Sequence, residues 1–274
     1  MAKPQFLELS DAEPIPILFE DRSVIAIDKP AGWMLVPHSW QRTGWNLQAA
    51  INSSINAGHY WARSRNLKFL RYIHRLDADT SGVLLFGKSF GAVETYGDLF
   101  ESRQMEKRYL AIVHGQPHDA EWTCRLALSA NPQAIGSVHV DEQGKECETF
   151  FRTLATKSGY SLVEAHPFTG RQHQIRVHLN AVGHGILGDP LYGPSSEQAA
   201  FTRPAMALRS VELSYRDPFT KRPVRIQAAA ETWLKKYGWE ERTKNSRSRP
   251  LAAPPSSPQK PDSEKRGALP LKRI

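Results

Sequence analysis

One short segment of the chain combines a cation, a carboxylate and a sharp turn ahead of an apolar run. Residues 74–82 read His-Arg-Leu-Asp-Ala-Asp-Thr-Ser-Gly, and Val-Leu-Leu-Phe follows directly. This order predicts a loop that brings Arg75 and Asp77 to the start of a buried strand, where loop residues commonly carry function. An ionised carboxylate in that position can act as a nucleophile. A simpler interpretation stays open, because the same carboxylate could cap the turn at Thr80 and Ser81.

A second segment, residues 169–179, reads Thr-Gly-Arg-Gln-His-Gln-Ile-Arg-Val-His-Leu. Thr169 followed three residues later by Gln172 has the form of a capping box, which predicts that a helix begins there. Helical spacing puts apolar residues on a stripe that is expected to pack on the core: Ile175, Leu179 and Val182. It puts polar residues on a stripe that is expected to face a cleft: His173, Arg176 and Asn180. The start of such a helix favours anionic ligands, although an ordinary amphipathic surface helix has the same pattern.

These two segments and others resemble the RluA-type pseudouridine synthases, in the order that the family has them. Residues 74–82 are similar to the HRLDxxTSG motif at every specified position, and residues 169–179 to TGRxHQIRVHL. The further matching segments are 17–21, 24–32 with its Lys-Pro-Ala-Gly, 107–115 and 188–193. The resemblance extends from about Ile15 to Ala230, and motifs that recur in order are far more specific than any single one.

The resemblance implies an activity and the residues that carry it. The family isomerises uridine in RNA to pseudouridine, so the expected function is that of a pseudouridine synthase acting on ribosomal or transfer RNA. Asp77 corresponds to the catalytic nucleophile, Tyr109 to a tyrosine that packs on the flipped base and helps to move a proton, and Arg176 to the arginine beside the carboxylate. The expected substrate-binding residues are Arg75, which would fill the gap left by the base, and Lys107, Arg171, His173 and Gln174. Lys29 is expected to fix a turn and His74 to shape the loop.

This chemistry is expected to need no cofactor. Isomerisation uses neither a redox group nor phosphate energy, and the chain has no Walker A loop and no GxGxxG motif. His173 and His178 are five residues apart, off a shared helical face, so no metal site is expected. Two departures from the family pattern should lie near the substrate and affect target choice: Leu208-Arg209-Ser210 in place of Leu-His-Ala, and the proline in Ala165-His166-Pro167-Phe168.

Two other classes of protein fit parts of the sequence. Residues 77–80 also match DxDxT, the nucleophile loop of haloacid-dehalogenase-type phosphatases, but that class needs an apolar strand directly before the first Asp, and His74 and Arg75 interrupt it. It also needs a later acidic pair for Mg²⁺, whereas Gly193 stands four residues after Asp189. A non-catalytic RNA-binding protein is the third possibility. The joint presence of an Asp, a Tyr and an Arg in the motifs disfavours it.

The hydrophobic pattern predicts an α+β fold with a mixed, largely antiparallel bent sheet, flanking helices and a central active-site cleft. Strands are predicted at Ile15–Glu20, Val24–Asp28, Val83–Lys88, Tyr109–His114, Glu148–Ala155, Tyr160–His166, Ala207–Tyr215 and Val224–Ala229. Helices are predicted at Leu47–Ile55, Phe90–Gln104 and Glu231–Trp239. Because strands outnumber helices and rarely alternate with them, a parallel α/β sheet is disfavoured.

Composition predicts three regions and an RNA partner. The 274 residues carry a net charge of +8, of which residues 242–274 hold +7 together with six prolines. We expect an N-terminal extension at 1–14, a catalytic domain at 15–241 and a disordered basic Pro-rich tail at 242–274. The tail would either tether RNA or be dispensable. The nearly neutral body should bind RNA through cations in or beside the motifs: Arg71, Arg75, Arg103, Lys107, Arg108, Arg171 and Arg176.

The apolar runs and the cysteines indicate in which compartment the protein is expected. No apolar run is long enough to span a bilayer, so no membrane association is expected. Cys124 and Cys147 lie in separate segments without a CxxC spacing, which disfavours a disulfide scaffold or a zinc site and makes the cytoplasm the expected compartment. We expect a monomer without a nucleotide cofactor.

Overall fold

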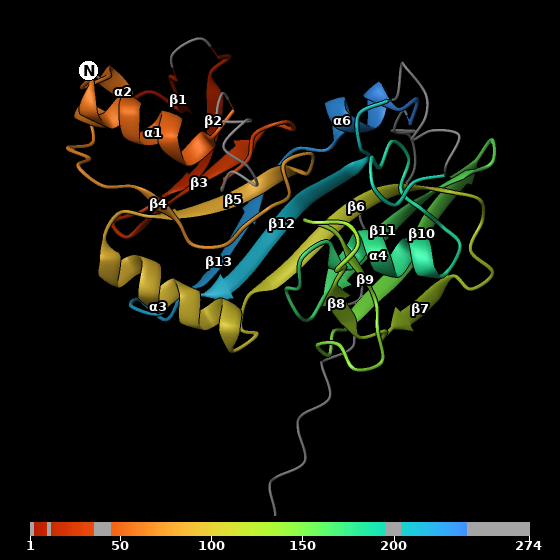
Figure 1. Ribbon diagram of the computed structural model, residues 1–274. Coiled ribbons are helices and arrows are strands. Elements are labelled where there is room, and N and C mark those ends of the chain that lie inside the picture. The colour runs from red at the N-terminus through yellow and green to blue at the C-terminus, as the bar shows by residue number, and fades with distance from the viewer. Residues whose placement is uncertain (1–2, 10–11, 36–44, 195–203, 240–274) are drawn as a thin grey trace, which may run out of the picture.

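The computed structural model describes residues 3–9, 12–35, 45–194 and 204–239, so the predicted tail at 242–274 lies outside the described residues. The central feature is one large sheet with the strand order β1-β2-β3-β5-β12-β6-β11-β10-β7, in which β13 also pairs with β12 and β4 with β5 (Figure 1). The strands of this sheet are β1 Phe6–Leu7, β2 Ile15–Glu20, β3 Val24–Lys29, β4 Arg71–Tyr72, β5 Ser81–Gly87, β6 Glu106–His114, β7 Glu121–Cys124, β10 Thr149–Lys157, β11 Tyr160–Pro167, β12 Leu208–Arg216 and β13 Pro223–Gln227. Strands β8 Leu128–Ala130 and β9 Val138–Val140 form a small separate sheet.

The predicted α+β class with a mixed, largely antiparallel sheet is confirmed. Every described pair of strands is antiparallel except β12 with β5, which pair through Arg209 opposite Ser81 and Ser210 opposite Gly82. These two residue pairs connect the half of the sheet that contains β5 with the half that contains β6. The segment 74–82 therefore ends where the two halves of the sheet meet.

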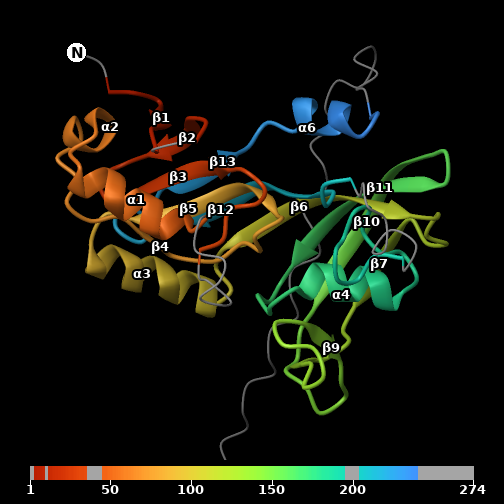
Figure 2. The same cartoon turned by 45° about the horizontal axis from the view of Figure 1, so that its top comes forward.

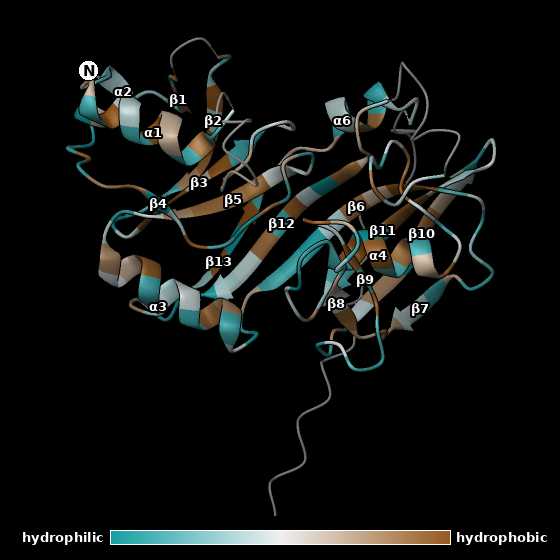
Figure 3. Cartoon of the chain, in the orientation of Figure 1, coloured by the Kyte–Doolittle hydropathy of each residue, from teal (hydrophilic) through white to brown (hydrophobic). Residues whose placement is uncertain are grey.

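Both faces of the N-terminal half of the sheet are covered. The helices are α1 Leu47–Asn56, α2 Tyr60–Arg63, α3 Phe90–Glu101, α4 Gln174–Ala181 and α6 Glu231–Lys236. Alternate residues of a strand point to opposite faces. Ile25 and Leu84 accordingly belong to the core that contains α1, and Ala26 and Leu85 to the core that contains α3. Figure 2 shows α1 and α3 on opposite sides of β3 and β5. Such double burial explains why the two strands read as continuous apolar runs, as their colour in Figure 3 shows.

The predicted strands and helices of the long periodic segments all occur, with ends that differ by a few residues. The pattern missed the short elements, because two to four residues carry too little periodicity: β1, β4, β7, β8, β9 and α2. The segment expected as an N-terminal extension contributes β1, and Leu7 is fully buried in the main core. No helix among the described residues is both long and apolar enough to cross a membrane.

The expected capping box at Thr169 is wrong. Helix α4 begins at Gln174, and its N-cap His173 is left-handed, with φ of 53°, and makes no side-chain cap. Instead, the side-chain oxygen of Gln174 accepts hydrogen bonds from the Thr169 hydroxyl and the Arg171 backbone amide. The amphipathic pattern also fails, because residues 174–179 are all buried whereas Val182 is exposed. This helix packs against β9, β10 and β11, so Gln174, Arg176 and His178 are buried with their partners.

Candidate active site

Asp77 lies in the loop that leads into β5, and its carboxylate is bonded to a buried arginine. Nη1 of Arg176 donates to Oδ2 of Asp77 at 2.9 Å. The side chain of Asp77 is 25 % exposed whereas that of Arg176 is 3 % exposed. The carboxylate thus faces solvent on one side and a fixed cation on the other. This places the two residues together as the sequence predicts, although they are 99 positions apart.

Arg176 is held in place by a second carboxylate, Asp189, which is completely buried. Nε and Nη2 of Arg176 donate to the two oxygens of Asp189 at 2.7 and 2.8 Å, a bidentate geometry. Burial alone would raise the pKa of Asp189, but Arg176 and the backbone amides of Leu191 and Tyr192 hold that pKa below its usual value. Arg176 also lies over the ring of Tyr192, with 5.0 Å to the ring centroid. The guanidinium is therefore fixed before any substrate binds.

His173 lies on the other side of the Asp77 carboxylate. Its Nε2 is 3.8 Å from Oδ1 of Asp77, and its Nδ1 makes a 2.8 Å hydrogen bond with the Tyr192 hydroxyl. Because the ring is 92 % buried, its orientation is set by this bond and by the packing around it. His173 thus belongs to the surroundings of the carboxylate, as expected of a site residue.

The buried side chain of Lys29 holds the loop that carries Asp77. Its Nζ donates to the backbone carbonyls of Ala78 at 2.8 Å, Thr80 at 2.8 Å and Pro30 at 3.0 Å, and the residue is fully buried. Burial lowers the pKa of Lys29 to about 7, against the opposing charges of Asp77 and Asp79. One buried ammonium thus donates to three backbone carbonyls, and the Ala78 carbonyl also accepts from the Gly32 backbone amide. As expected, Lys29 fixes a turn, and this turn is the one that carries Asp77.

Lys29→Met is expected to remove a pH dependence from the stability of the protein. Between the folded pKa of about 7 and the ordinary value of 10.5, the unfolded chain binds a proton that the folded chain lacks. The free energy of unfolding of the wild type therefore rises with pH in this window, by up to about 1.4 kcal/mol per pH unit from this group. Urea unfolding of both proteins across the window measures it. The wild-type value minus the variant value should grow with pH, and a constant difference would contradict the argument.

Tyr109 lies on β6 opposite Ser210 of β12. Burial raises the pKa of Tyr109 well above its usual value, a hydrogen bond from the Ser210 side chain lowers it in part, and the charge of Asp77 raises it further. Tyr109 is accordingly a neutral phenol at neutral pH, and its hydroxyl can donate a proton or a hydrogen bond. The residue is 8 % exposed, so most of its surface is covered by the protein.

The remaining predicted site residues fall into two groups. Arg75 and Arg171 are exposed, and Nε of Arg171 donates to the Glu146 carbonyl. Lys107 donates to the Thr169 carbonyl at 2.8 Å, and burial, followed by the charge of Arg103, lowers its pKa to about 8. Gln174, which is expected to bind substrate, is 4 % exposed, and its amide is hydrogen-bonded to Thr169, Glu148 and Thr149. Its bonds link the segment 169–179 to β10, because a buried polar atom needs a hydrogen-bond partner.

Three further residues that the sequence singled out, His74, Arg108 and Arg209, have partners within the protein. His74 accepts a hydrogen bond from the Leu85 amide, and burial lowers its pKa to about 3, which agrees with a role in shaping the loop. Arg108 is not part of an open positive face, because it is paired with Glu164 and Glu212. Arg209 of the unusual late strand is paired with Asp28 at 2.7 Å. This departure from the family pattern therefore ties β12 to β3.

The sequence did not predict the roles of Asp189, Tyr192 and Ser210. Asp189 and Tyr192 stand in the Gly-Asp-Pro-Leu-Tyr-Gly segment, whose resemblance to the family implies no role for either residue. The sequence signal for their roles was an acidic residue and a tyrosine three residues apart in one short segment.

The structure disfavours the phosphatase alternative. That class needs a strand directly before the first Asp, but β4 ends at Tyr72 and Asp77 lies in the loop before β5. Asp189, the acidic residue considered for Mg²⁺, is bonded to Arg176. Within the described part of the chain, no group of three or more His, Cys, Asp or Glu side chains could hold a metal ion.

Comparison with known proteins identifies the family. The family model described as RNA pseudouridylate synthase matches residues 23–181. The mouse pseudouridylate synthase RPUSD2 is 38 % identical over 192 residues, which are 68 % of this chain and 33 % of the mouse protein. The ribosomal large subunit pseudouridine synthase C of Salmonella typhimurium is 33 % identical over 227 residues, which are 80 % of this chain and 68 % of that protein. The chain belongs to the RNA pseudouridylate synthase family.

Within the family, similarity to the ribosomal large subunit pseudouridine synthases C and D places the chain in the RluA-type group. The solved structure of human RNA Pseudouridylate Synthase Domain Containing 1 superimposes with a TM-score of 0.63 at 25 % identity, over 81 % of this chain and 86 % of that one. The match to the mouse and human RPUSD2 proteins spans about a third of their length.

Proposed function

We propose that this protein is an RNA pseudouridine synthase in which Asp77 is the catalytic group. The observation that carries the proposal is the Asp77–Arg176 pair: a partly exposed carboxylate bonded to a buried guanidinium that Asp189 holds from behind. A guanidinium in this position pairs with the carboxylate through a charge-assisted hydrogen bond and keeps it pointed at one place. A protein that only binds RNA has no need for a negative charge beside phosphates.

The reaction separates uracil from C1′ of its ribose, turns the base, and joins C5 to C1′. The N1–C1′ bond breaks and a C5–C1′ bond forms, N1 gains a proton, and C5 loses one, so the product is an isomer of the substrate. Attack of the carboxylate on C1′, its addition to C6 of the base, and a glycal route all use Asp77 as an ionised group next to the nucleoside. In each route Arg176 is already fixed beside the carboxylate, so the site need not reorganise as the charge of Asp77 changes during the reaction.

Binding requires that the target uridine leaves its stack, at a cost of a few kcal/mol. Tyr109 is proposed to pack against the extruded base, and Arg75 to occupy the space that the base leaves. Stacking on an aromatic ring contributes about 1–3 kcal/mol, which offsets much of this cost. Arg171, Lys107 and His173 are proposed to bind or position the RNA around the target. The targets proposed are uridines of ribosomal or transfer RNA, modified in the cytoplasm by a monomer.

Substitutions of Tyr109 should separate its two roles. Tyr109→Phe keeps the ring and loses the hydroxyl, so kcat should fall while RNA affinity changes little. Tyr109→Ala should also weaken RNA binding, by roughly the 1–3 kcal/mol of one stacked base. Single-turnover rates and equilibrium binding of both variants measure the two effects. Equal rates for Tyr109→Phe and the wild type would show that the hydroxyl takes no part in proton movement.

The proposed activity is tested directly by incubating the purified protein with unmodified transcripts of ribosomal and transfer RNA and mapping pseudouridine. Pseudouridine at one or a few defined positions is the expected result. The same map in cells with and without the gene identifies the natural target. Absence of pseudouridine in both experiments would contradict the proposed function.

The basic tail at 242–274 is proposed to add affinity by tethering RNA. Its charge of +7 exceeds that of the nearly neutral body, which supports a role in binding rather than in chemistry.

A further inference from the structure

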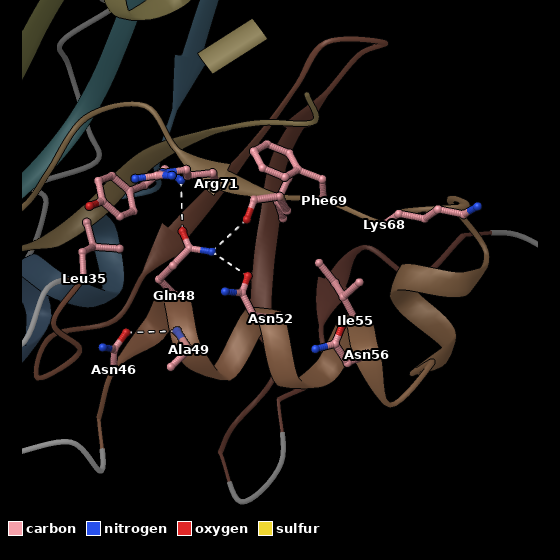
Figure 4. Close-up of a pocket in the computed structure, with 12 residues that line it drawn as sticks. Leu35, Asn46, Gln48, Ala49, Asn52, Ile55, Asn56, Lys68, Phe69 and Arg71 are labelled. Atoms are coloured by element: carbon pink, nitrogen blue, oxygen red, sulfur yellow. Dashed lines mark hydrogen bonds between the residues drawn. The ribbon is translucent and has the colours of Figure 1, made fainter. Parts of the chain in front are cut away.

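A groove outside the candidate active site lies between helix α1 and the segment that leads into β4. Its volume is about 590 Å³, within the range of ligand sites. One wall is formed by α1, with the amide side chains of Gln48, Asn52 and Asn56 beside apolar residues, and the other by residues 68–72. Figure 4 shows Gln48 and Asn52 pointing from the helix toward the wall that carries Phe69 and Arg71. We define this feature as the α1 groove.

The amides on α1 form an ordered row. Gln48, Asn52 and Asn56 are four residues apart, which places them on one face of the helix. Gln48 ties the two walls together: its Nε2 donates to the Leu70 carbonyl at 2.8 Å and its Oε1 accepts from the Tyr72 amide at 3.2 Å. The same Nε2 lies 2.9 Å from Oδ1 of Asn52, so the oxygen of Asn52 is occupied and its NH₂ group is directed elsewhere. Asn52 is exposed and presents two N–H donors to a ligand.

The charged residues that line the α1 groove are all positive. Its lining contains two cationic residues, Lys68 and Arg71, and no acidic residue. Both are exposed. Phe69, between them, is half-buried and packs against Phe90 with ring centroids 4.4 Å apart. Amide donors for the edges of bases, cations for phosphates and an aromatic side chain are the combination by which proteins bind single-stranded RNA.

The groove is close to the loop that carries Asp77. The backbone amide of Gly32 donates to the Ala78 carbonyl at 2.8 Å, and Leu35, which lines the groove, is three residues further along the chain. Three residues of extended chain span about 10 Å. On the opposite wall, Tyr72 is separated from Asp77 by four residues. An RNA strand with its target uridine beside Asp77 is therefore within reach of the groove.

We propose that the α1 groove binds nucleotides of the substrate RNA that flank the target uridine on one side. This inference rests on the proposed function, since it assigns the groove to the same RNA. Lys68 and Arg71 contact phosphates, and the Asn52 amide bonds the edge of a base. The groove thus determines which sequence context is held while Asp77 acts.

The first test uses Lys68→Gln combined with Arg71→Gln and a fluorescent oligouridylate as the single-stranded probe. Each lost phosphate contact flattens the slope of log K against log salt by about 0.7, so the double variant should lose about 1.4 in slope and bind several-fold more weakly. The matched control is Lys221→Gln combined with Arg222→Gln, two exposed cations in the β12–β13 turn that do not line the groove. The control should keep the wild-type slope.

A second variant tests the base contact. Asn52→Ala removes two donors and no charge, so it should weaken binding of the oligouridylate without changing the salt slope. Thermal unfolding of each variant checks that the fold is intact. The inference would be overturned if the groove variants kept the salt slope and RNA affinity of the wild type. It would also be overturned if the Lys221→Gln, Arg222→Gln control lost as much slope and affinity as the Lys68→Gln, Arg71→Gln variant.

Turnover separates this inference from the proposed function. The groove variants should raise KM for the RNA transcript that the wild type modifies and leave kcat unchanged, because neither Lys68 nor Arg71 touches the carboxylate. If the wild type forms pseudouridine and the groove variants have its KM, only the groove assignment fails. If the wild type forms none, the proposed function fails, while the oligouridylate slopes still report on binding in the groove.

Discussion

Asp77→Asn is expected to abolish pseudouridine formation while RNA affinity stays close to that of the wild type. Asparagine has nearly the same volume as aspartate but carries no charge and is not a nucleophile, so the rate should fall by at least about a thousandfold. Arg176 would keep its bidentate bond to Asp189, which preserves the shape of the site. Single-turnover assays and equilibrium RNA binding measure the two quantities. Residual turnover within about tenfold of the wild type would remove Asp77 from the catalytic role.

Asp79→Asn is the matched control for this experiment. Asp79 stands two residues away in the same loop, and among the described residues no ion pair joins its carboxylate to Arg176. Its neutralisation should leave substantial turnover. If Asp79→Asn were inactive and Asp77→Asn active, the motif would be matched in the wrong register.

Gly82→Ala is expected to destabilise the whole protein. Gly82 has φ of 111°, a conformation that side chains rarely adopt, and a Cβ there would overlap the backbone carbonyl oxygen of Ser210. That carbonyl belongs to β12, and the two strands meet at only two residue pairs. Strain and steric overlap each cost about 1–3 kcal/mol, so a loss of roughly 4 kcal/mol is expected. For a domain of this size, Tm should fall by about 8–16 °C.

Gly32→Ala separates backbone strain from steric overlap. Gly32 also has a positive φ, of 92°, but a Cβ there would have no heavy atom within 4 Å. This variant should lose only the strain, about 1–3 kcal/mol. Thermal and urea unfolding of both variants measure the difference. Equal losses would show that the contact of β5 with β12 does not set the requirement for glycine at position 82.

The sequence alone determined the long elements and the central pair of the site. Period-two and continuous apolar runs predicted the main strands because burial on one or both faces of a sheet leaves a direct imprint on the order of residues. Motif order brought Asp77, Tyr109 and Arg176 into one hypothesis, and the structure places Arg176 on the Asp77 carboxylate. The short elements carry too few residues for such a pattern, so β4, directly before the Asp77 loop, was not predicted.

Only the tertiary structure decided how these residues are held. Helix α4 looked amphipathic in sequence, yet it packs against β9, β10 and β11, and so Gln174 and Arg176 are buried with partners from other segments. Asp189 became the support of Arg176, and Lys29 the anchor of the Asp77 loop, through hydrogen bonds between residues 13 and about 50 positions apart. A buried polar atom must find a partner wherever the fold supplies one. Local spacing cannot identify that partner, since it reports only on neighbours along the chain.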